Sequence, residues 1–288
     1  MAGALIAALP DGRLHLQEGP IDLVIGLDGT RAAMAEAART AAATFEGLLA
    51  GLAAELPLLR LPLGVDPPAL SGRVARRMAD AVWPFRRGFI TPMAAVAGAV
   101  AEEVLGAIAG IPGLLSAHVN NGGDIALFLA PGQVLRIGLV PCLERAAPEG
   151  LVRITAADTV RGVATSGWPG RSFSRGIADA VTVLAATAAQ ADAAATVIAN
   201  AVDVVHPAVE RAPADSLDPD SDLGGLPVTV AVGALPAAMI EAALDAGEAV
   251  AETLLQRGLI EGALLVVQGA MRTVGAPRML EGVPPARA

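Results

Sequence analysis

Apolar and polar residues alternate in two short runs near the start of the chain, Arg13–Glu18 and Ile21–Leu27. A Gly-Pro pair separates these runs and is typical of a turn, so the pattern predicts a β-hairpin. The next stretch, Thr30–Glu55, is rich in Ala, Leu and Met and begins with a residue that caps helix N-termini well. It predicts one long helix that ends before Pro57.

Two more helices are predicted before the middle of the chain. The first covers Ser71–Trp83. The second covers Met93–Ala109, where Thr91-Pro92 places a capping residue directly before a proline at the first helical position. Small residues dominate the first turns of this second helix, which permits close approach of either a neighbouring strand or a ligand. Packing is the commoner reason for such a surface.

Three arginines, Arg73, Arg76 and Arg77, lie about one turn apart on the first of these two helices and share a face. They form most of the one concentration of basic residues in the chain. A run of charges is usually a solvated surface. The alternative is a patch that faces a phosphate group, and the spacing leaves both interpretations open.

The second half of the chain mixes short apolar runs with helical stretches and does not alternate strictly between them, which favours an α+β fold over a doubly wound sheet. We expect mainly antiparallel sheets flanked by helices, in one domain over residues 1–275 with a C-terminal tail over 276–288. The interval 206–226 is rich in Pro and acidic residues and predicts an exposed loop or insert. Strands are predicted at Asp124–Ala130, Val134–Val140, Leu151–Thr155, Thr159–Thr165, Val181–Ala185, Val228–Val232 and Leu259–Gln268, and helices at Ala188–Val202 and Pro236–Gln256.

Charge and cysteine content narrow the classes of function. The formal net charge of -9 argues against a nucleic-acid partner, because binding to phosphate backbones needs clustered Lys and Arg. Helical stretches are interrupted by charges before they reach about twenty apolar residues, so no membrane span is expected. A lone cysteine, Cys142, excludes an intramolecular disulfide and fits a cytoplasmic protein.

The stretch Asn120-Asn121-Gly122-Gly123-Asp124 lies between two apolar runs and is the first candidate for a ligand site. Two adjacent glycines let the backbone approach a ligand and leave N–H groups available to oxygen atoms. Asn-Gly between alternating runs is also a strong hairpin signal. A plain turn and a ligand loop therefore both remain open, although the doubled Asn and the following Asp exceed what a turn needs.

Two later motifs carry further candidates. Thr165, Ser166 and Gly167 follow a predicted strand, where hydroxyls suit phosphate or ribose oxygens. Asp192 and Thr196 are four residues apart on a predicted helix, so the carboxylate and the hydroxyl share a face and could hold a hard cation such as Mg²⁺. The ordinary alternative is an Asp favoured by the helix dipole and a Thr packed against the sheet.

A polar, glycine-bearing loop before the strand at 181–185 holds two candidate catalytic residues, Ser174 and Asp179. Either side chain could serve as an acid–base group, and Asp179 could instead act as a second metal ligand. Asp179 could also simply pair with Arg175, and the spacing does not choose among these roles.

The order of these motifs resembles the ApbE-like superfamily, whose best-known members are FAD:protein FMN transferases, formerly called thiamine biosynthesis lipoproteins. The similar segments are PMAAVAGAVAEE, NNGGDIAL, GRSFSRGIADAVTVLA and ADAAATVIANAV, which fall between Thr91 and Asp203. They are most similar to an uncharacterised bacterial and archaeal branch of that superfamily.

The resemblance implies a site for FAD or a related nucleotide as the small-molecule ligand, with Mg²⁺ near its pyrophosphate. Gly122, Gly123 and Asp124 would approach the nucleotide, and Thr165, Ser166 and Gly167 would line it. By the same resemblance Asp192 and Thr196 would be the metal ligands, and the metal would polarise the pyrophosphate during phosphoryl transfer.

Two departures separate this chain from the transferases. Gly98 stands where they usually have a lysine, and their His-x-x-Asp-Pro-x-Thr-Gly segment is shortened here to Ser174–Asp179. We therefore expect a binder of a flavin- or nucleotide-type phosphate ligand, with flavin transfer open. The alternatives are a non-catalytic accessory protein of a metabolic or sulfur-handling complex, and a different enzyme that reuses the cleft. Helices rich in small residues permit close subunit packing, which predicts a homodimer.

Overall fold

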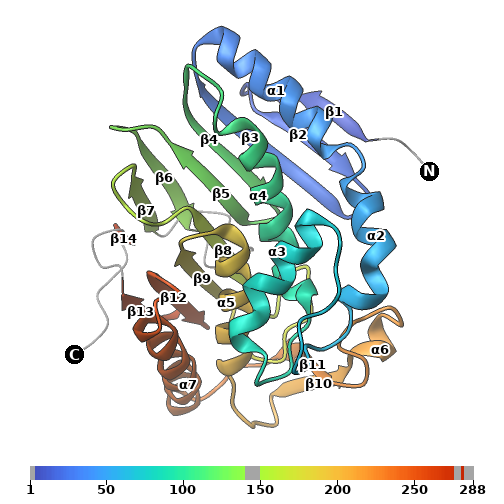
Figure 1. Cartoon of the computed structure of the whole chain (residues 1–288). Coiled ribbons are helices and arrows are strands. Elements are labelled where there is room, and N and C mark those ends of the chain that lie inside the picture. Colours follow the sequence, from blue (N-terminus) through green and yellow to red (C-terminus); the bar gives the residue numbers. More distant parts are fainter. Residues whose placement is uncertain (1–3, 140–149, 276–279, 282–288) are drawn as a thin grey trace. The chain divides into compact units, whose positions relative to one another are not determined.

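The computed structural model describes residues 4–139, 150–275 and 280–281, and Figure 1 shows the chain coloured along its sequence. Two compact units form, and we describe each by itself. Among the described residues, the first unit consists of 4–135, 155–164 and 186–192, and the second consists of 136–139, 150–154, 165–185, 193–275 and 280–281. The single domain expected over 1–275 stays a prediction.

The first unit is built on antiparallel strands that lie side by side in chain order. They are β1 (Leu5–Ala8), β2 (Leu14–Glu18), β3 (Ile21–Gly29), β4 (Leu114–Asn121) and β5 (Asp124–Leu129), with the start of β8 (Gly162–Ser166) beside β5. Alternate residues of β3 point into the core, where Leu23 and Ile25 are fully buried. This period of two places the apolar side chains on one face of the sheet.

Two helices, α1 (Arg31–Phe45) and α4 (Val96–Ile108), cover strands β3 to β5 (Figure 1). Helix α1 buries Ala33, Ala37, Ala41 and Phe45, which are four residues apart and therefore lie on one face. Because most of these side chains are small, the helix lies close to its neighbours. Further helices of this unit are α2 (Leu48–Leu59), α3 (Arg73–Val82) and the short 3-10 turns η1 (Trp83–Phe85) and η2 (Pro92–Ala95).

The second unit has an antiparallel sheet of β9 (Ala180–Ala185), β12 (Gly262–Val267) and β13 (Ala270–Gly275), against which α7 (Ala237–Gln256) packs. All six residues of β9 and of β12 are buried. The remaining strands form a pair, β10 (Val209–Pro213) with β11 (Pro227–Val232), and a three-stranded sheet of β6 (Val134–Leu139), β7 (Gly150–Thr155) and β14 (Leu280–Glu281). Helix α6 is Ala214–Leu217, and α5 (Ala188–Ala201) starts in the first unit and continues into the second.

The prediction of an α+β fold with mainly antiparallel sheets is confirmed, since every strand pair with a defined register in the described residues is antiparallel. The hairpin predicted over 13–27 is confirmed as β2 and β3. The caps are also as predicted: the Ala33 N–H donates to Thr30 Oγ1 over 3.2 Å, and the Met93 N–H donates to Thr91 Oγ1 over 3.2 Å.

The single helix predicted over Thr30–Glu55 is wrong. The chain forms α1 and α2 instead, because Gly47 has a left-handed backbone with φ of 82° and interrupts the helix. Pro57 lies inside α2 rather than beyond its end. Helix α2 continues past the expected stop at Glu55 and ends at Leu59.

The exposed loop predicted over 206–226 is wrong for 209–217, which form β10 and α6, with β10 paired to β11. Residues 218–226 form no helix or strand, as predicted. Strands β6 and β7 belong to a small sheet with β14 and do not pair with β5, which precedes them in the chain. Cys142 and most of the predicted tail, 276–279 and 282–288, lie outside the described residues.

By length and composition alone, the helical stretch Arg31–Leu59 is long and apolar enough to cross a membrane. It comprises α1 and α2, which Gly47 separates. Helix α1 buries one face against the rest of the protein, as helices of globular proteins do. The apolar composition of this stretch therefore does not by itself identify a membrane-spanning helix.

We expect Gly47→Ala to lower the free energy of unfolding by about 1 kcal/mol, because a Cβ is strained in the left-handed region. Gly51→Ala is the matched control: both positions have open space where a Cβ would lie, but Gly51 is inside α2. This second change should stabilise by roughly 0.5–1 kcal/mol. Urea unfolding measures both, and equal effects of the two changes would contradict the role of Gly47 as the helix break.

Candidate functional site

The motif Asn120–Asp124 forms the hairpin between β4 and β5. Asn121 and Asp124 are directly paired, and Gly122 and Gly123 between them have φ of 65° and 114°. The local structure is therefore a two-residue turn that needs both glycines. Asn120 Oδ1 accepts from the Gly123 N–H over 2.8 Å, and the space where a Gly123 Cβ would lie is open.

The polar side chains of this turn meet the first turn of α4. Asn121 is 7% exposed, and its Nδ2 donates to the Ala97 carbonyl over 3.2 Å. Asp192, from the beginning of α5, accepts from the Gly98 N–H over 3.0 Å. Two motifs that are about seventy residues apart in sequence thus reach the same helix end.

Burial raises the pKa of Asp192 well above its ordinary value, and the negative charge of Asp124 raises this pKa further. Hydrogen bonds from the Gly98 and Ala97 N–H groups act in the opposite direction but do not offset these two effects. Asp124 itself is only 9% exposed. Two carboxylates therefore repel one another in a partly desolvated place, which is an arrangement that a bound cation would relieve.

The donor set fits a hard cation such as Mg²⁺, since all candidate ligands are oxygen atoms. The described residues contain no group of three or more His, Cys, Asp or Glu side chains that could hold a metal. Beyond Asp124 and Asp192, the ligands would have to be neutral oxygens, water or a bound phosphate, which is how Mg²⁺ is commonly held. Thr196, the other predicted metal ligand, follows one turn later in α5.

Gly98 is buried, and a Cβ at this position would lie 2.3 Å from the carbonyl oxygen of Ala188. The start of α5 therefore packs directly on the backbone of α4. A side chain of any size at position 98 would collide with main-chain atoms, which cannot move aside as a flexible side chain can. This packing is a physical reason for the absence of the transferase lysine.

The residues predicted to line a nucleotide, Thr165, Ser166 and Gly167, lie at the end of β8 in the second unit. Thr165 Oγ1 is 2.8 Å from Thr182 Oγ1 on β9. A Cβ on Gly167 would lie 2.4 Å from the carbonyl oxygen of Asp179, so this glycine permits close packing of the following loop. Their ligand role stays a prediction.

Both predicted catalytic residues make contacts that hold the local fold. The carboxylate of Asp179 accepts from the N–H of Gln268 at the β12–β13 turn, and burial raises its pKa. Ser174 is 3% exposed, and its hydroxyl donates to Asn200 Oδ1 over 3.4 Å. These contacts give each residue a structural role, and their catalytic roles stay predictions.

Two residues with a part in this architecture were missed by sequence reasoning. Glu102 on α4 accepts from the Ala189 N–H over 2.7 Å, so it caps the first turn of α5. Gln268 adopts a φ of 47° and binds both Leu235 and Gly233 through its side chain. The hydrogen-bond partner of each residue is more than thirty residues away in the sequence. The sequence around Glu102 or Gln268 therefore contains no signal that predicts this partner.

Comparison with known proteins decides the family. The model of a protein family described as "AbpE bacteria" matches residues 6–273. The chain belongs to this family. The resemblance to the ApbE-like superfamily is thereby confirmed.

Relatives of this family member include UPF0280 proteins of methanogenic archaea. That of Methanosphaerula palustris is 37% identical over 147 residues, which are 51% of this chain and 60% of the relative. That of Methanopyrus kandleri is 42% identical over 142 residues, which are 48% of this chain and 54% of the relative. The chain thus spans about half of the length of the curated relatives it matches.

Solved structures with a similar arrangement carry the name ApbE. The apo flavinyl transferase ApbE of Pseudomonas stutzeri is 14% identical, with a TM-score of 0.46 over 98% of this chain and 97% of that one. The flavin transferase ApbE of Vibrio cholerae is 13% identical, with a TM-score of 0.43 over 96% of this chain and 98% of that one.

We expect Gly98→Ala to lower the free energy of unfolding by about 1–3 kcal/mol, because the new methyl group meets the Ala188 carbonyl. Gly106→Ala is the matched control, since Gly106 lies on the same helix, is exposed and has open space around it. The control should stabilise by roughly 0.5–1 kcal/mol. Chemical denaturation measures both, and a stable Gly98→Ala protein would show that α5 does not pack on α4 in this way.

The raised pKa of Asp192 predicts a pH-dependent gain in stability for Asp192→Asn in a buffer free of divalent ions. A carboxylate whose pKa is higher in the folded state loses stability as pH rises from the unfolded pKa through the folded one. The neutral amide avoids that loss and can still accept from Gly98. The thermal midpoint of the variant should therefore exceed that of the wild type at pH 7.5, and the gain should shrink toward pH 4.

The midpoint should rise by roughly 2 °C for each kcal/mol gained in a chain of this size. Asp66→Asn, at an exposed position in the first unit, controls for a general effect of net charge. A variant that is less stable than the wild type at both pH values would contradict the repulsion between the two carboxylates.

Proposed function

We propose that this protein binds a flavin- or nucleotide-type ligand through its phosphates, with Mg²⁺ held between Asp124 and Asp192. The observation that carries the proposal is the pair of carboxylates at the first turn of α4, where burial and, after it, the charge of Asp124 raise the pKa of Asp192. Two carboxylates that repel each other lower the stability of the folded protein when no cation is bound. This cost supports a role for the pair in binding a cation. Membership of an ApbE-like family supports a flavin as the organic part.

The residues of the turn and of α5 have separate parts in this proposal. Asp192 is oriented by the Gly98 N–H, and an ionised carboxylate has about four lone-pair sites, so it keeps acceptor capacity for the metal. Asn121 fixes the turn to α4 through Ala97. The open space at Gly123 lets a phosphate approach the backbone. When bound, Mg²⁺ would neutralise charge on the pyrophosphate. Thr196 stays the predicted further ligand.

Binding rather than FMN transfer is the conclusion that the residues support best. The transferase lysine is replaced by Gly98, which has no room for a side chain, and the histidine-containing segment is reduced to Ser174–Asp179. The same departures favour a second candidate function, a non-catalytic accessory protein of a metabolic or sulfur-handling complex. In that case the two carboxylates would no longer serve a ligand.

Calorimetric titration of the full chain tests the proposal. After treatment with a chelator, FAD should bind in the presence of Mg²⁺ and more weakly without it. Asp192→Asn should weaken Mg²⁺-dependent binding by roughly 10-fold or more, as loss of a charged ligand requires, while Asp66→Asn should bind like the wild type.

The outcomes separate the candidate functions. Absence of FAD binding at high micromolar concentration would overturn the flavin proposal, and a stable protein partner recovered from the native organism would then favour the accessory role. Transfer of FMN from FAD releases AMP, so AMP release in the same mixture would show that the protein is a transferase and not only a binder.

A further inference from the structure

A cavity in the first unit contains none of the motif residues of the proposed site. Its volume is about 480 Å³, which is in the range of small-molecule sites. Helix α3 contributes its three arginines, Arg73, Arg76 and Arg77, to the wall, and the start of α5 contributes Gln190. These are the arginines for which the sequence left a solvated surface and a phosphate-facing patch both open.

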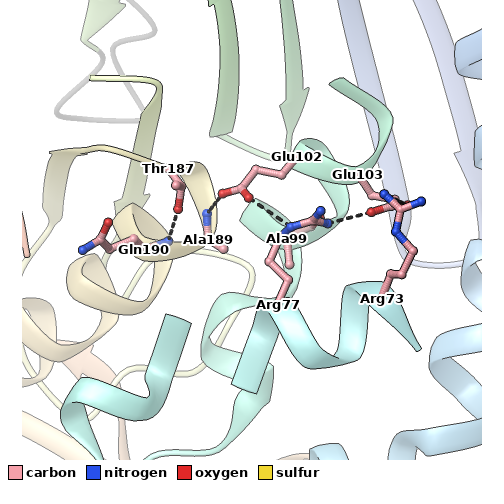
Figure 2. A network of polar contacts seen from close by, with 8 residues as sticks. All are labelled: Arg73, Arg77, Ala99, Glu102, Glu103, Thr187, Ala189 and Gln190. Carbon is pink, nitrogen blue, oxygen red and sulfur yellow. Dashed lines mark hydrogen bonds and ion pairs between the residues drawn. The ribbon is translucent and has the colours of Figure 1, made fainter. Parts of the chain in front are cut away.

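Arg77 belongs to a network of polar contacts that joins α3 to α4 (Figure 2). Its Nε lies 3.1 Å from Glu102, and its Nη1 donates to Glu103 over 2.8 Å and to the Ala99 carbonyl over 3.2 Å. Glu103 is only 8% exposed, so this pair ties α3 to α4. Glu102 is occupied on its other oxygen by the N–H of Ala189. The charges of Arg77 and Glu102 are therefore used within the protein.

Arg73 and Arg76 differ from Arg77 because they face solvent. The side chain of Arg73 is 74% exposed and contacts Glu103 through one nitrogen at 3.4 Å. Arg76 is exposed and donates through Nη1 to the Ser71 carbonyl. A guanidinium group has five N–H donors. Each arginine thus keeps donors for a further partner, and a carboxylate or phosphate suits their planar geometry.

A smaller cavity of about 240 Å³ adjoins the first, because Arg76 and Asp80 line both. Its other walls are mainly apolar and include Pro67, Leu70 and Trp83. The guanidinium carbon of Arg86 lies 4.4 Å from the centre of the Trp83 ring, which is a cation–π contact. A wall that carries the arginines of α3 and a mainly apolar wall therefore adjoin, with Arg76 and Asp80 at their junction.

We propose that these adjoining cavities form a binding site for a small molecule with one anionic group and an apolar or aromatic body. The anionic group would bind Arg73 and Arg76, and the body would lie against Trp83 and the neighbouring prolines. A carboxylate and a phosphate share this chemistry. The site needs neither Mg²⁺ nor FAD, so it stands or falls separately from the function proposed above.

Tryptophan fluorescence provides a direct test, because the chain has two tryptophans and the Trp168→Phe variant keeps only Trp83. In this background, phenyl phosphate and 3-phenylpropionate are titrated separately. We expect a saturable change in fluorescence with at least one of them, and the stronger binder identifies the anionic group. Inorganic phosphate should bind at least 10-fold more weakly, since it lacks the apolar body.

Arg76→Gln should weaken binding by about 10-fold or more, because it removes charge-assisted hydrogen bonds. Arg87→Gln is the matched control, since Arg87 is exposed and nearby but does not line either cavity. Both arginines are on the surface, so both variants should fold. No saturable change with either probe at millimolar concentration, equal binding by Arg76→Gln, or inorganic phosphate binding as tightly as phenyl phosphate would each overturn the proposal.

Discussion

The close crossing of α4 and the start of α5 is the contact on which the candidate site depends. Gly98 makes this crossing close enough for backbone to meet backbone, since a Cβ there would lie 2.3 Å from the Ala188 carbonyl. Two reciprocal hydrogen bonds then hold the helices. Asp192 of α5 accepts from the Gly98 N–H of α4, and Glu102 of α4 accepts from the Ala189 N–H of α5. Each helix thereby satisfies an N–H group of the other, which would otherwise lack an acceptor.

This crossing explains two features of the candidate site, namely the proximity of Asp124 and Asp192 and the lack of room for a side chain at position 98. Asp192 is brought close enough to Asp124 for the two charges to interact, which favours a cation between them. The same packing removes the space for a lysine at position 98. A cationic side chain and a close helix crossing are thus mutually exclusive at this position, so a lysine in place of the glycine would require α5 to move.

Local features of the fold could be predicted from the sequence because their causes are local. Thr30 and Thr91 cap helices within three residues of themselves, and the turn at Gly122-Gly123 is determined by its own φ values. The break at Gly47 was missed because the surrounding Ala and Leu residues favour a helix on both sides. The roles of Gly98 and Glu102 depend on partners about ninety residues away, and a helical glycine or glutamate has many ordinary explanations. Only the packing of two distant segments identifies their role.

Helix α4 also connects the two candidate sites of the first unit. Its first turn binds Asp192 and Asn121, while Glu102 and Glu103, one turn later, hold Arg77. These glutamates pair with Arg77, whereas Arg73 contacts only Glu103, through one nitrogen, and is otherwise exposed, and Arg76 is exposed as well, so both keep donors toward solvent. Arg77 ties α3 to α4 through its contacts with Glu102, Glu103 and the Ala99 carbonyl. The division of one arginine cluster into a structural member and two exposed members therefore follows from the position of α4, and it is the exposed members that have the freedom to bind a ligand.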